Sequence, residues 1–348
     1  MCPSYMVTRE EEHSTRGRSR LLFEMLEGHA DSPVTGGWRH RPASPGAAVR
    51  PPDVASLACP ARSRPGWAAR RGRPVAGHIH QPPDPAVGQA AVEVLEAAGW
   101  RVIVPDQPLC CGLTWISTGQ LATARRVLQR TVDALSPHLR RGTKIVGLEP
   151  SCTAVFRSDA RELMPGNRDV ERLGEQTVTL AELLTHHTDG WQPPQVGGQA
   201  IAQTHCHQHA IMGYDEDKAL LRAAGIDLDV LDAGCCGLGG NFGFEAGHYD
   251  VSMACGERAL LPAVRDAAED VLVLADGFSC RTQIEQGGTG RTPVHLAEVL
   301  AAGLHGEPVR PSRPAPPGAA DYLRLVGLAA AGASAAAAVA AAAVRRRR

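Results

Sequence analysis

The apolar positions follow helix and strand periods along a central stretch of the chain. This stretch begins with a predicted helix and a predicted strand. From Ala86 the segment VGQAAVEVLEAAG has the period of a helix ending at a glycine, and RVIVP follows as a buried strand. Residues 119–139 predict a long amphipathic helix, and KIVGLEP follows as another strand. The inward positions of that helix are Leu121, Ala124, Leu128, Val132 and Leu135.

The same order of elements returns further along the chain. The strand QAIAQTH precedes a helix through KALLRAAG, the strand LDVLD, a helix from about His248 and the strand VLVLAD. AAGWRVIVPDQPLCCGLTW at 97–115 aligns with AAGIDLDVLDAGCCGLGG at 223–240 with one residue of slippage. Alternating strands and helices therefore predict an α/β fold of two repeated half-domains, 85–190 and 191–305, each with a mostly parallel sheet.

The flanks lack this pattern. Residues 1–38 are polar apart from one helix expected at about 19–27, and 39–84, dense in Pro, Arg and Gly, predict a disordered linker. Residues 306–348 form a Pro-rich linker and an Ala-rich tail. Its run at 325–344 has the length of a membrane span, but alanine is only marginally apolar, so a membrane helix and an exposed helix both stay open.

The charge balance and the N-terminal segment bear on the expected partners and the cellular compartment. With 36 basic and 37 acidic residues, the net charge of −1 gives no electrostatic reason to expect a nucleic-acid partner. The polar start shows no cleavable signal peptide, so we expect a cytoplasmic protein, with membrane association through the tail left open. In such a reducing compartment, cysteines grouped near turns are more often metal ligands or redox groups than disulfides.

Seven of the ten cysteines lie just past predicted strands, where ligands of parallel sheets gather. They are Cys110, Cys111, Cys152, Cys206, Cys235, Cys236 and Cys280. Soft thiolates select iron–sulfur clusters, zinc or copper(I). Adjacent cysteines are unusual for one tetrahedral zinc ion but suit a larger cluster, and the glycine after each pair lets the backbone turn tightly. The alternative is that these cysteines are buried free thiols that only pack.

In these motifs the chain resembles the cysteine-rich CCG domain found in heterodisulfide reductase and in the iron–sulfur subunits of glycolate and lactate oxidases. It is similar over about residues 85–305 to the C-terminal region of FAD-linked oxidases of the D-lactate dehydrogenase type. The family places one cysteine before each Cys-Cys-Gly and a Cys-x-x-Cys after it. The resemblance implies an iron–sulfur cluster of the 4Fe–4S type, cubane or noncubane, with zinc as the alternative.

The chain also departs from that pattern. EPSC at Cys152 and GFSC at Cys280 each lack one terminal cysteine. The position matching Cys206 in the first half falls near His80, so Cys110, Cys111 and Cys152 are expected to form an incomplete site. We expect the second-half set to be the stronger site.

The N-terminal segment resembles the same oxidases, because MCPSY matches the end of a ferredoxin-type cysteine run. Only Cys2 of that run is present, and 39–84 contain only Cys59. The resemblance stops at about Trp38 and resumes near Pro85, which suggests a shifted reading frame over 39–84 and makes 1–38 a remnant of a ferredoxin-like region. FAD is then expected only on a missing domain or a partner, since no Gly-rich flavin fingerprint is present.

Several polar residues near the cysteines allow two interpretations. His207 and His209 in HCHQH are potential ligands or proton carriers, or else part of a solvated turn. The loop GLGGNFGFEAGHYD lacks phosphate-binding spacing and suits a tight loop over a cluster or substrate. Its Glu245, His248 and Tyr249 either line that site or cap the next helix.

Three further positions are expected to be structural. Glu149 and Asp276 end matching strands, where turn chemistry alone explains a carboxylate. Cys255 lies within a predicted helix and is expected in the core.

The first hypothesis is an oxidoreductase component. Its cluster would relay electrons from a flavin-containing dehydrogenase that oxidises a 2-hydroxy acid such as lactate or glycolate, toward a quinone or another carrier, and the chain would not turn over alone. The second is a zinc-stabilised structural or interaction domain in which four cysteines close the site. The third is an inactive fragment of a truncated oxidase gene.

Overall fold

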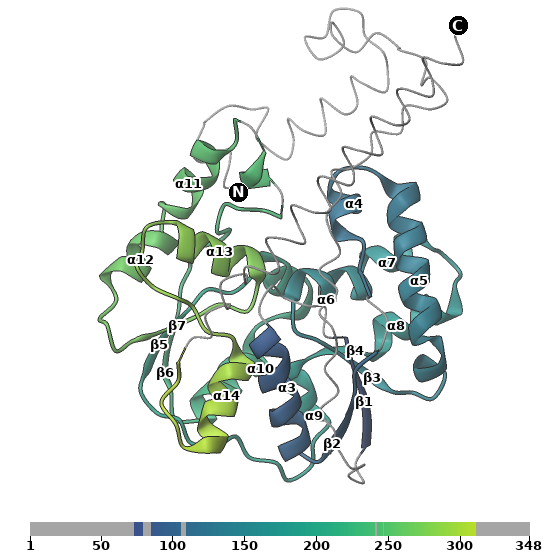
Figure 1. The fold of residues 1–348 in the computed structure, drawn as a ribbon, viewed down its shortest axis with the longest axis horizontal. Helices are drawn as coiled ribbons and strands as arrows, with labels where there is room; N and C mark the ends of the chain where they lie inside the picture. The colour runs from purple at the N-terminus through teal and green to yellow at the C-terminus, as the bar shows by residue number, and fades with distance from the viewer. Residues whose placement is uncertain (1–72, 79–84, 106–108, 241, 246, 311–348) are drawn as a thin grey trace, which may run out of the picture. The chain divides into compact units, whose positions relative to one another are not determined.

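Two parallel β-sheets, one in each half of the chain, position the cysteines (Figure 1). The computed structural model describes residues 73–78, 85–105, 109–240, 242–245 and 247–310. The first sheet has the strand order β2-β1-β3-β4, and the second has the order β6-β5-β7. Their bounds are β1 (Arg73–His78), β2 (Trp100–Ile103), β3 (Lys144–Gly147), β4 (Thr177–Thr179), β5 (Gln199–Ala202), β6 (Asp227–Val230) and β7 (Leu272–Leu274).

The first half begins with β1 and α3, and the chain then adds three more strands to the same sheet, β2, β3 and β4. Helix α3 buries Val87, Ala91, Val94 and Leu95, which recur at helical spacing on one face. The helices of this half are α3 (Pro85–Ala97), α4 (Leu113–Ser117), α5 (Leu121–Leu139), α6 (Pro150–Arg157), α7 (Asp159–Leu163), α8 (Arg168–Gln176) and α9 (Leu180–His186). The predicted inward face of α5 is confirmed at four positions, but Leu121, its first residue, is 49% exposed.

The second half repeats this plan with fewer strands. Its helices are η2, a π-helical turn (Gln208–Met212), α10 (Asp215–Ala223), the 3₁₀ turn η3 (Phe242–Phe244), α11 (Tyr249–Gly256), α12 (Leu260–Asp266), α13 (Phe278–Gln286) and α14 (Leu296–His305). Beside β7, Val294 makes an isolated parallel bridge to Leu274 at the position that β4 holds beside β3.

The repeat predicted from the sequence is confirmed by the order of the strands. In each half the first strand is central: β1 lies between β2 and β3, and β5 lies between β6 and β7. Cys-Cys-Gly follows the second strand and a cysteine-bearing helix follows the third, so all these residues leave the carboxyl ends of parallel strands.

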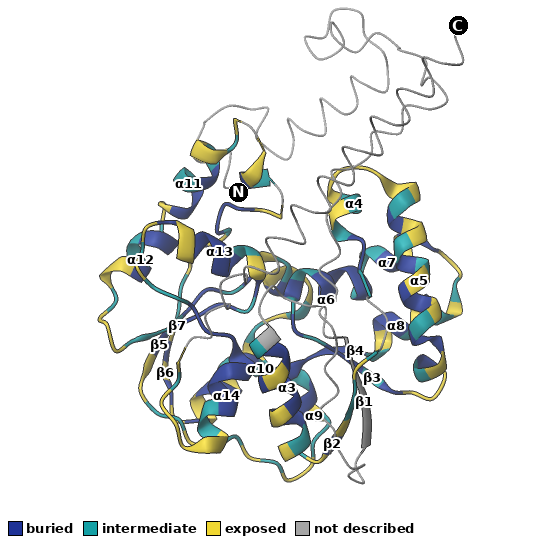
Figure 2. Cartoon of the chain, viewed as in Figure 1, coloured by how far each residue is buried: buried dark blue, intermediate teal, exposed yellow. Residues whose placement is uncertain are grey.

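The core is divided among three clusters of buried side chains. One connects the halves, because it joins α3 and α9 with α14 and both sheets. The second surrounds α5 and α6, and the third lies under α12 and α13. Figure 2 shows the surrounding helices buried on one side and exposed on the other, as their sequence pattern predicts.

One boundary differs from the prediction. Strand β1 lies inside the segment 39–84 that we expected to be a disordered linker, and that expectation is wrong for residues 73–78. The strand is too short and too close to Pro and Arg to show a period, but hydrogen bonds from neighbours on both sides hold it.

Other expectations fall on residues outside the described part of the chain. They concern the helix at 19–27, the rest of the linker including His80, the cysteines Cys2 and Cys59, and the tail 325–344. Within the described ranges, none of the helices has the length and apolar character needed to cross a bilayer.

Candidate metal centre

Three loops bring the second-half cysteines together. Cys206 begins a helical turn after β5 that continues into the π-helical turn η2, a distortion often found at functional sites. Cys235 and Cys236 follow β6, and Cys280 is the third residue of α13. Each cysteine therefore stands at the carboxyl end of a strand of one sheet.

Neighbouring thiols of this set interact in series. Cys206 bonds to Cys235, Cys235 bonds to Cys236, and Cys236 bonds to Cys280. Cys236 and Cys280 are buried, Cys235 is half-buried, and Cys206 is exposed. The four sulfurs therefore run from the core to the surface, which suits a group that must exchange electrons with a partner.

The pKa of Cys235 is shifted in the opposite direction to those of Cys206 and Cys236. The Cys206 and Cys236 thiols donate to Cys235 and hold the pKa of Cys235 far below its usual value. The same contact with Cys235 raises the pKa of Cys206. The pKa of Cys236 is raised by its contacts with Cys235 and Cys280. A cation bound among these sulfurs would favour their thiolate forms, because an opposite charge nearby lowers the pKa of a thiol.

Gly237 is required by the shape of the Cys-Cys-Gly turn. Its φ of +98° lies in the left-handed region, and a Cβ there would lie 2.1 Å from the carbonyl oxygen of Ser252. The Gly237 N–H donates to Cys235 Sγ at 3.4 Å. The glycine thus lets the turn pack on α11 while its amide faces a sulfur, which agrees with the close backbone approach expected from the sequence.

The first half brings three thiols together in the same way. Cys111 Sγ lies 3.0 Å from Cys152 Sγ, and the Gly112 N–H donates to Cys110 Sγ at 3.4 Å. The hydrogen bond from Cys110 lowers the pKa of Cys111, but the contact with Cys152 and burial outweigh it and raise the pKa overall. Thr131 of α5 accepts from the Cys110 N–H at 3.0 Å and donates to its carbonyl at 2.8 Å, which fixes the turn.

A single carboxylate connects the two cysteine-bearing helices. Glu149 caps α6, accepting from the backbone N–H and the hydroxyl of Ser151. Its other oxygen accepts from the backbone N–H of Phe278, the first residue of α13, at 2.8 Å. Cys152 and Cys280 are the third residues of these two helices, so Glu149 fixes the first turns that carry a thiol in each half.

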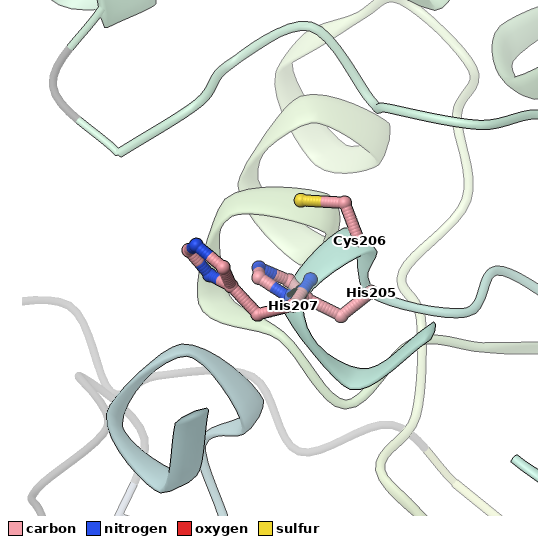
Figure 3. A group of neighbouring side chains, drawn as sticks. All are labelled: His205, Cys206 and His207. Atoms are coloured by element: carbon pink, nitrogen blue, oxygen red, sulfur yellow. Dashed lines mark hydrogen bonds between the residues drawn. The ribbon is translucent and has the colours of Figure 1, made fainter. Parts of the chain in front are cut away.

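Two histidines lie beside Cys206. The ligand atoms of His205, Cys206 and His207 all lie within 4.8 Å of one another (Figure 3). The sequence indicated His207 and His209 as candidates; His209 is exposed and outside this group, and His205, which is buried, was missed. The segment HCHQH does contain His205, but only the structure shows that the turn after β5 folds its ring back beside Cys206.

Side chains of the glycine-rich loop that follows the second Cys-Cys-Gly contact one another. His248 stacks on Phe242 with ring centroids 4.3 Å apart and lies 3.1 Å from the Glu245 carboxylate. Tyr249 is 63% exposed. Of the two interpretations, these contacts favour local packing at the start of α11. Cys255, in α11, is buried as predicted.

The residues present fit a thiolate-ligated metal group. Four thiols that interact in series are a soft donor set, and three of them are buried or half-buried, which limits the access of water. His207 Nδ1 is buried and has no hydrogen-bond partner among the described residues. Both observations are accounted for by a cationic group bound among these side chains.

The family comparison agrees with the repeat. The model of the cysteine-rich CCG domain matches residues 76–157 and 205–285. The first match begins within β1, and each match contains one Cys-Cys-Gly and one cysteine-bearing helix.

Curated relatives are similar over the same region. A subunit of the anaerobic glycerol-3-phosphate dehydrogenase of Escherichia coli K12 is 27% identical over 225 residues, which cover 63% of this chain and 56% of the relative. Lactate utilization protein A of Bacillus velezensis is 27% identical over 231 residues, covering 62% of this chain and 92% of the relative. The protein of the same name from Bacillus subtilis is 25% identical. The chain thus spans little more than half of the E. coli protein. The family match, the repeat and the two thiol sets therefore agree: residues 76–157 and 205–285 of this chain each resemble the CCG cysteine-rich domain.

Proposed function

We propose that this chain is the iron–sulfur electron-transfer component of an oxidoreductase that oxidises a 2-hydroxy acid of the lactate or glycolate type. Cys206, Cys235, Cys236 and Cys280 would hold the cluster. The observation that carries the proposal is the continuous contact of these four thiols at the end of one parallel sheet. A bound cluster would supply one-electron chemistry at this point of the fold.

The chain's own residues would tune such a site in three ways. The Gly237 N–H donates to Cys235 Sγ, and hydrogen bonds to sulfur ligands stabilise their negative charge. Burial of Cys236 and Cys280 lowers the local dielectric. Cys206 leaves one side open to solvent, where a partner could approach.

The first-half thiols would form a second, smaller site. Cys110, Cys111 and Cys152 contribute three sulfurs among the described residues. We propose that this set binds metal more weakly than the second-half set, because three protein ligands leave a position to be filled from elsewhere. Glu149 would then keep the two sites in a fixed relation.

The proposed substrate and partners are supported by the names of the relatives rather than by the site. One relative is named for lactate and another for a glycerol-3-phosphate dehydrogenase, and both compounds are small hydroxylated anions. We propose that a flavin-containing dehydrogenase oxidises such a substrate and reduces this chain, which passes the electrons to a quinone or another carrier. FAD would reside on that dehydrogenase.

Metal and acid-labile sulfide analysis of the anaerobically purified chain tests the site. We expect iron with matching sulfide, lost in Cys235→Ser/Cys236→Ser and retained in Cys255→Ala, whose thiol lies in the core outside the four-thiol chain. The reduced protein should then be reoxidised by a soluble quinone. Stoichiometric zinc without sulfide would instead indicate the structural zinc domain. An iron content that is unchanged in the double variant would refute the assigned ligands.

A further inference from the structure

We propose that His207 is a nitrogen ligand of the metal group held by the second-half cysteines, and that His205 is not a ligand but donates an N–H hydrogen bond beside it. This inference rests on the proposed function, since it concerns the same site. It adds a ligand of a different chemical class to the four thiolates.

The two rings and the thiol are neighbours. Figure 3 shows the side chains of His205, Cys206 and His207 close together, and one ligand atom of each residue lies within 4.8 Å of the others. All three residues belong to one helical turn after β5, so no rearrangement of separate elements is needed to bring a nitrogen and a sulfur to one metal.

His207 has the free nitrogen. Its Nδ1 is buried and makes no hydrogen bond within the described part of the chain, although buried polar atoms are normally paired. The ring is held by its tilted contact with His205, at a centroid distance of 5.3 Å. A metal bound at Nδ1 would give this atom the partner that it lacks.

His205 differs because one of its nitrogens is already used. His205 Nδ1 accepts the backbone N–H of His207 at 3.2 Å, so in the neutral ring the proton resides on Nε2, which makes Nε2 a donor. The ring is 4% exposed and lies against Gly277, where a Cβ would come within 2.1 Å of His205 Cδ2. Gly277 thus makes room for an imidazole whose remaining nitrogen carries a hydrogen.

A nitrogen ligand has a measurable electronic consequence. A neutral imidazole at position 207 brings no negative charge to the metal group, whereas a thiolate at the same position would, and histidine ligation gives higher reduction potentials in other iron–sulfur centres. His207 would therefore make this centre easier to reduce than the same centre with a cysteine at position 207.

Pulsed electron paramagnetic resonance on the full chain tests the ligand directly. The protein is grown with ¹⁵N-histidine, loaded with iron and sulfide under anaerobic conditions and reduced with dithionite. We expect a strong ¹⁵N coupling that is lost in His207→Ala and retained in His209→Ala, the matched control on the exposed side of the same turn. His207→Cys, which keeps a ligand, should retain the cluster and lower its midpoint potential.

The outcomes separate this inference from the proposed function. A cluster with normal iron and sulfide but no histidine coupling would overturn the role of His207 alone. A coupling that persists in His207→Ala and disappears in His205→Ala would overturn the assignment and make His205 the ligand. Absence of iron and sulfide from the wild-type protein would refute both proposals together.

Discussion

Glu149 Oε2 accepts a hydrogen bond from the backbone N–H of Phe278, a residue 129 positions further along the chain. The same carboxylate caps its own helix through Ser151. One side chain thereby satisfies first-turn donors of both cysteine-bearing helices, α6 and α13. A helix first turn has N–H groups with no partner inside the helix, so this contact lies where each helix needs it.

Glu149→Ala should destabilise the junction of the two halves. Loss of a cap and of a charged hydrogen bond is expected to cost about 1–3 kcal/mol in the free energy of unfolding. Urea unfolding of the metal-free protein measures it, with Glu175→Ala on an exposed position of α8 as the control. Equal stability of both variants would mean that Glu149 does not hold the halves together.

Three glycine-to-alanine substitutions should form a graded series. Gly190 has a φ of +72° with open space around its Cβ position, Gly112 has a φ of +82° with the Ala124 oxygen at 3.3 Å, and Gly237 adds a clash at 2.1 Å. We expect losses in unfolding free energy of about 1, about 1–2 and more than about 3 kcal/mol, respectively. Thermal or urea unfolding gives the order, and a Gly237→Ala protein as stable as Gly190→Ala would contradict the packing described for the turn.

Asp169 should stabilise the fold only above acidic pH. Hydrogen bonds from Arg140 and Ser136 hold the pKa of Asp169 well below its usual value. A carboxyl with a lower pKa in the folded state contributes stability above the unfolded pKa near 3.8, and this contribution is lost as the pH falls. Asp169→Asn should therefore be less stable than wild type at pH 7, with the difference shrinking below about pH 4.

Urea unfolding from pH 7 to pH 3 tests this dependence on Asp169. Asp133→Asn on the exposed face of α5 serves as the control. A difference that stays constant with pH would show that the Asp169 carboxylate is not responsible.

Asp217 should have the opposite effect. It is buried in α10 with a hydrogen bond from Gln208 at 3.2 Å, and burial raises its pKa well above the usual value. As the pH rises past 3.8 the unfolded chain releases this proton more readily than the folded protein, so Asp217 lowers stability. Asp217→Asn should gain stability relative to wild type as the pH rises above 3.8, whereas Asp215→Asn, on the exposed side of α10, should show no such gain.

The two thiol sets should load independently. A Cys110→Ser/Cys111→Ser/Cys152→Ser variant is expected to keep the iron and sulfide of the second-half site, because those four thiols come from other loops. Metal analysis and the visible spectrum measure what remains. Loss of all iron from this variant would show that the halves form one shared site.

The repeat could be predicted because each Cys-Cys-Gly turn, and the apolar pattern of the strand before it, is contained in a short stretch of sequence. It also predicted that four cysteines leave the carboxyl ends of parallel strands, which is where they meet. The contact between Glu149 and Phe278 could not be predicted, since it depends on how two halves pack and not on any period. His205 was missed for a similar reason: its ring direction is fixed by the turn and by the space over Gly277.

Strand β1 sets a minimum length for any excised version of this protein. Because β1 is hydrogen-bonded on both sides, a fragment that starts at Pro85 would leave β2 and β3 facing each other across a missing strand. Strands β2 and β3 would then expose unpaired backbone amides and carbonyls, which can pair with strands of other molecules and cause aggregation. Fragments prepared for biochemistry should therefore start before Arg73, because residues 73–78 belong to the domain rather than to its linker.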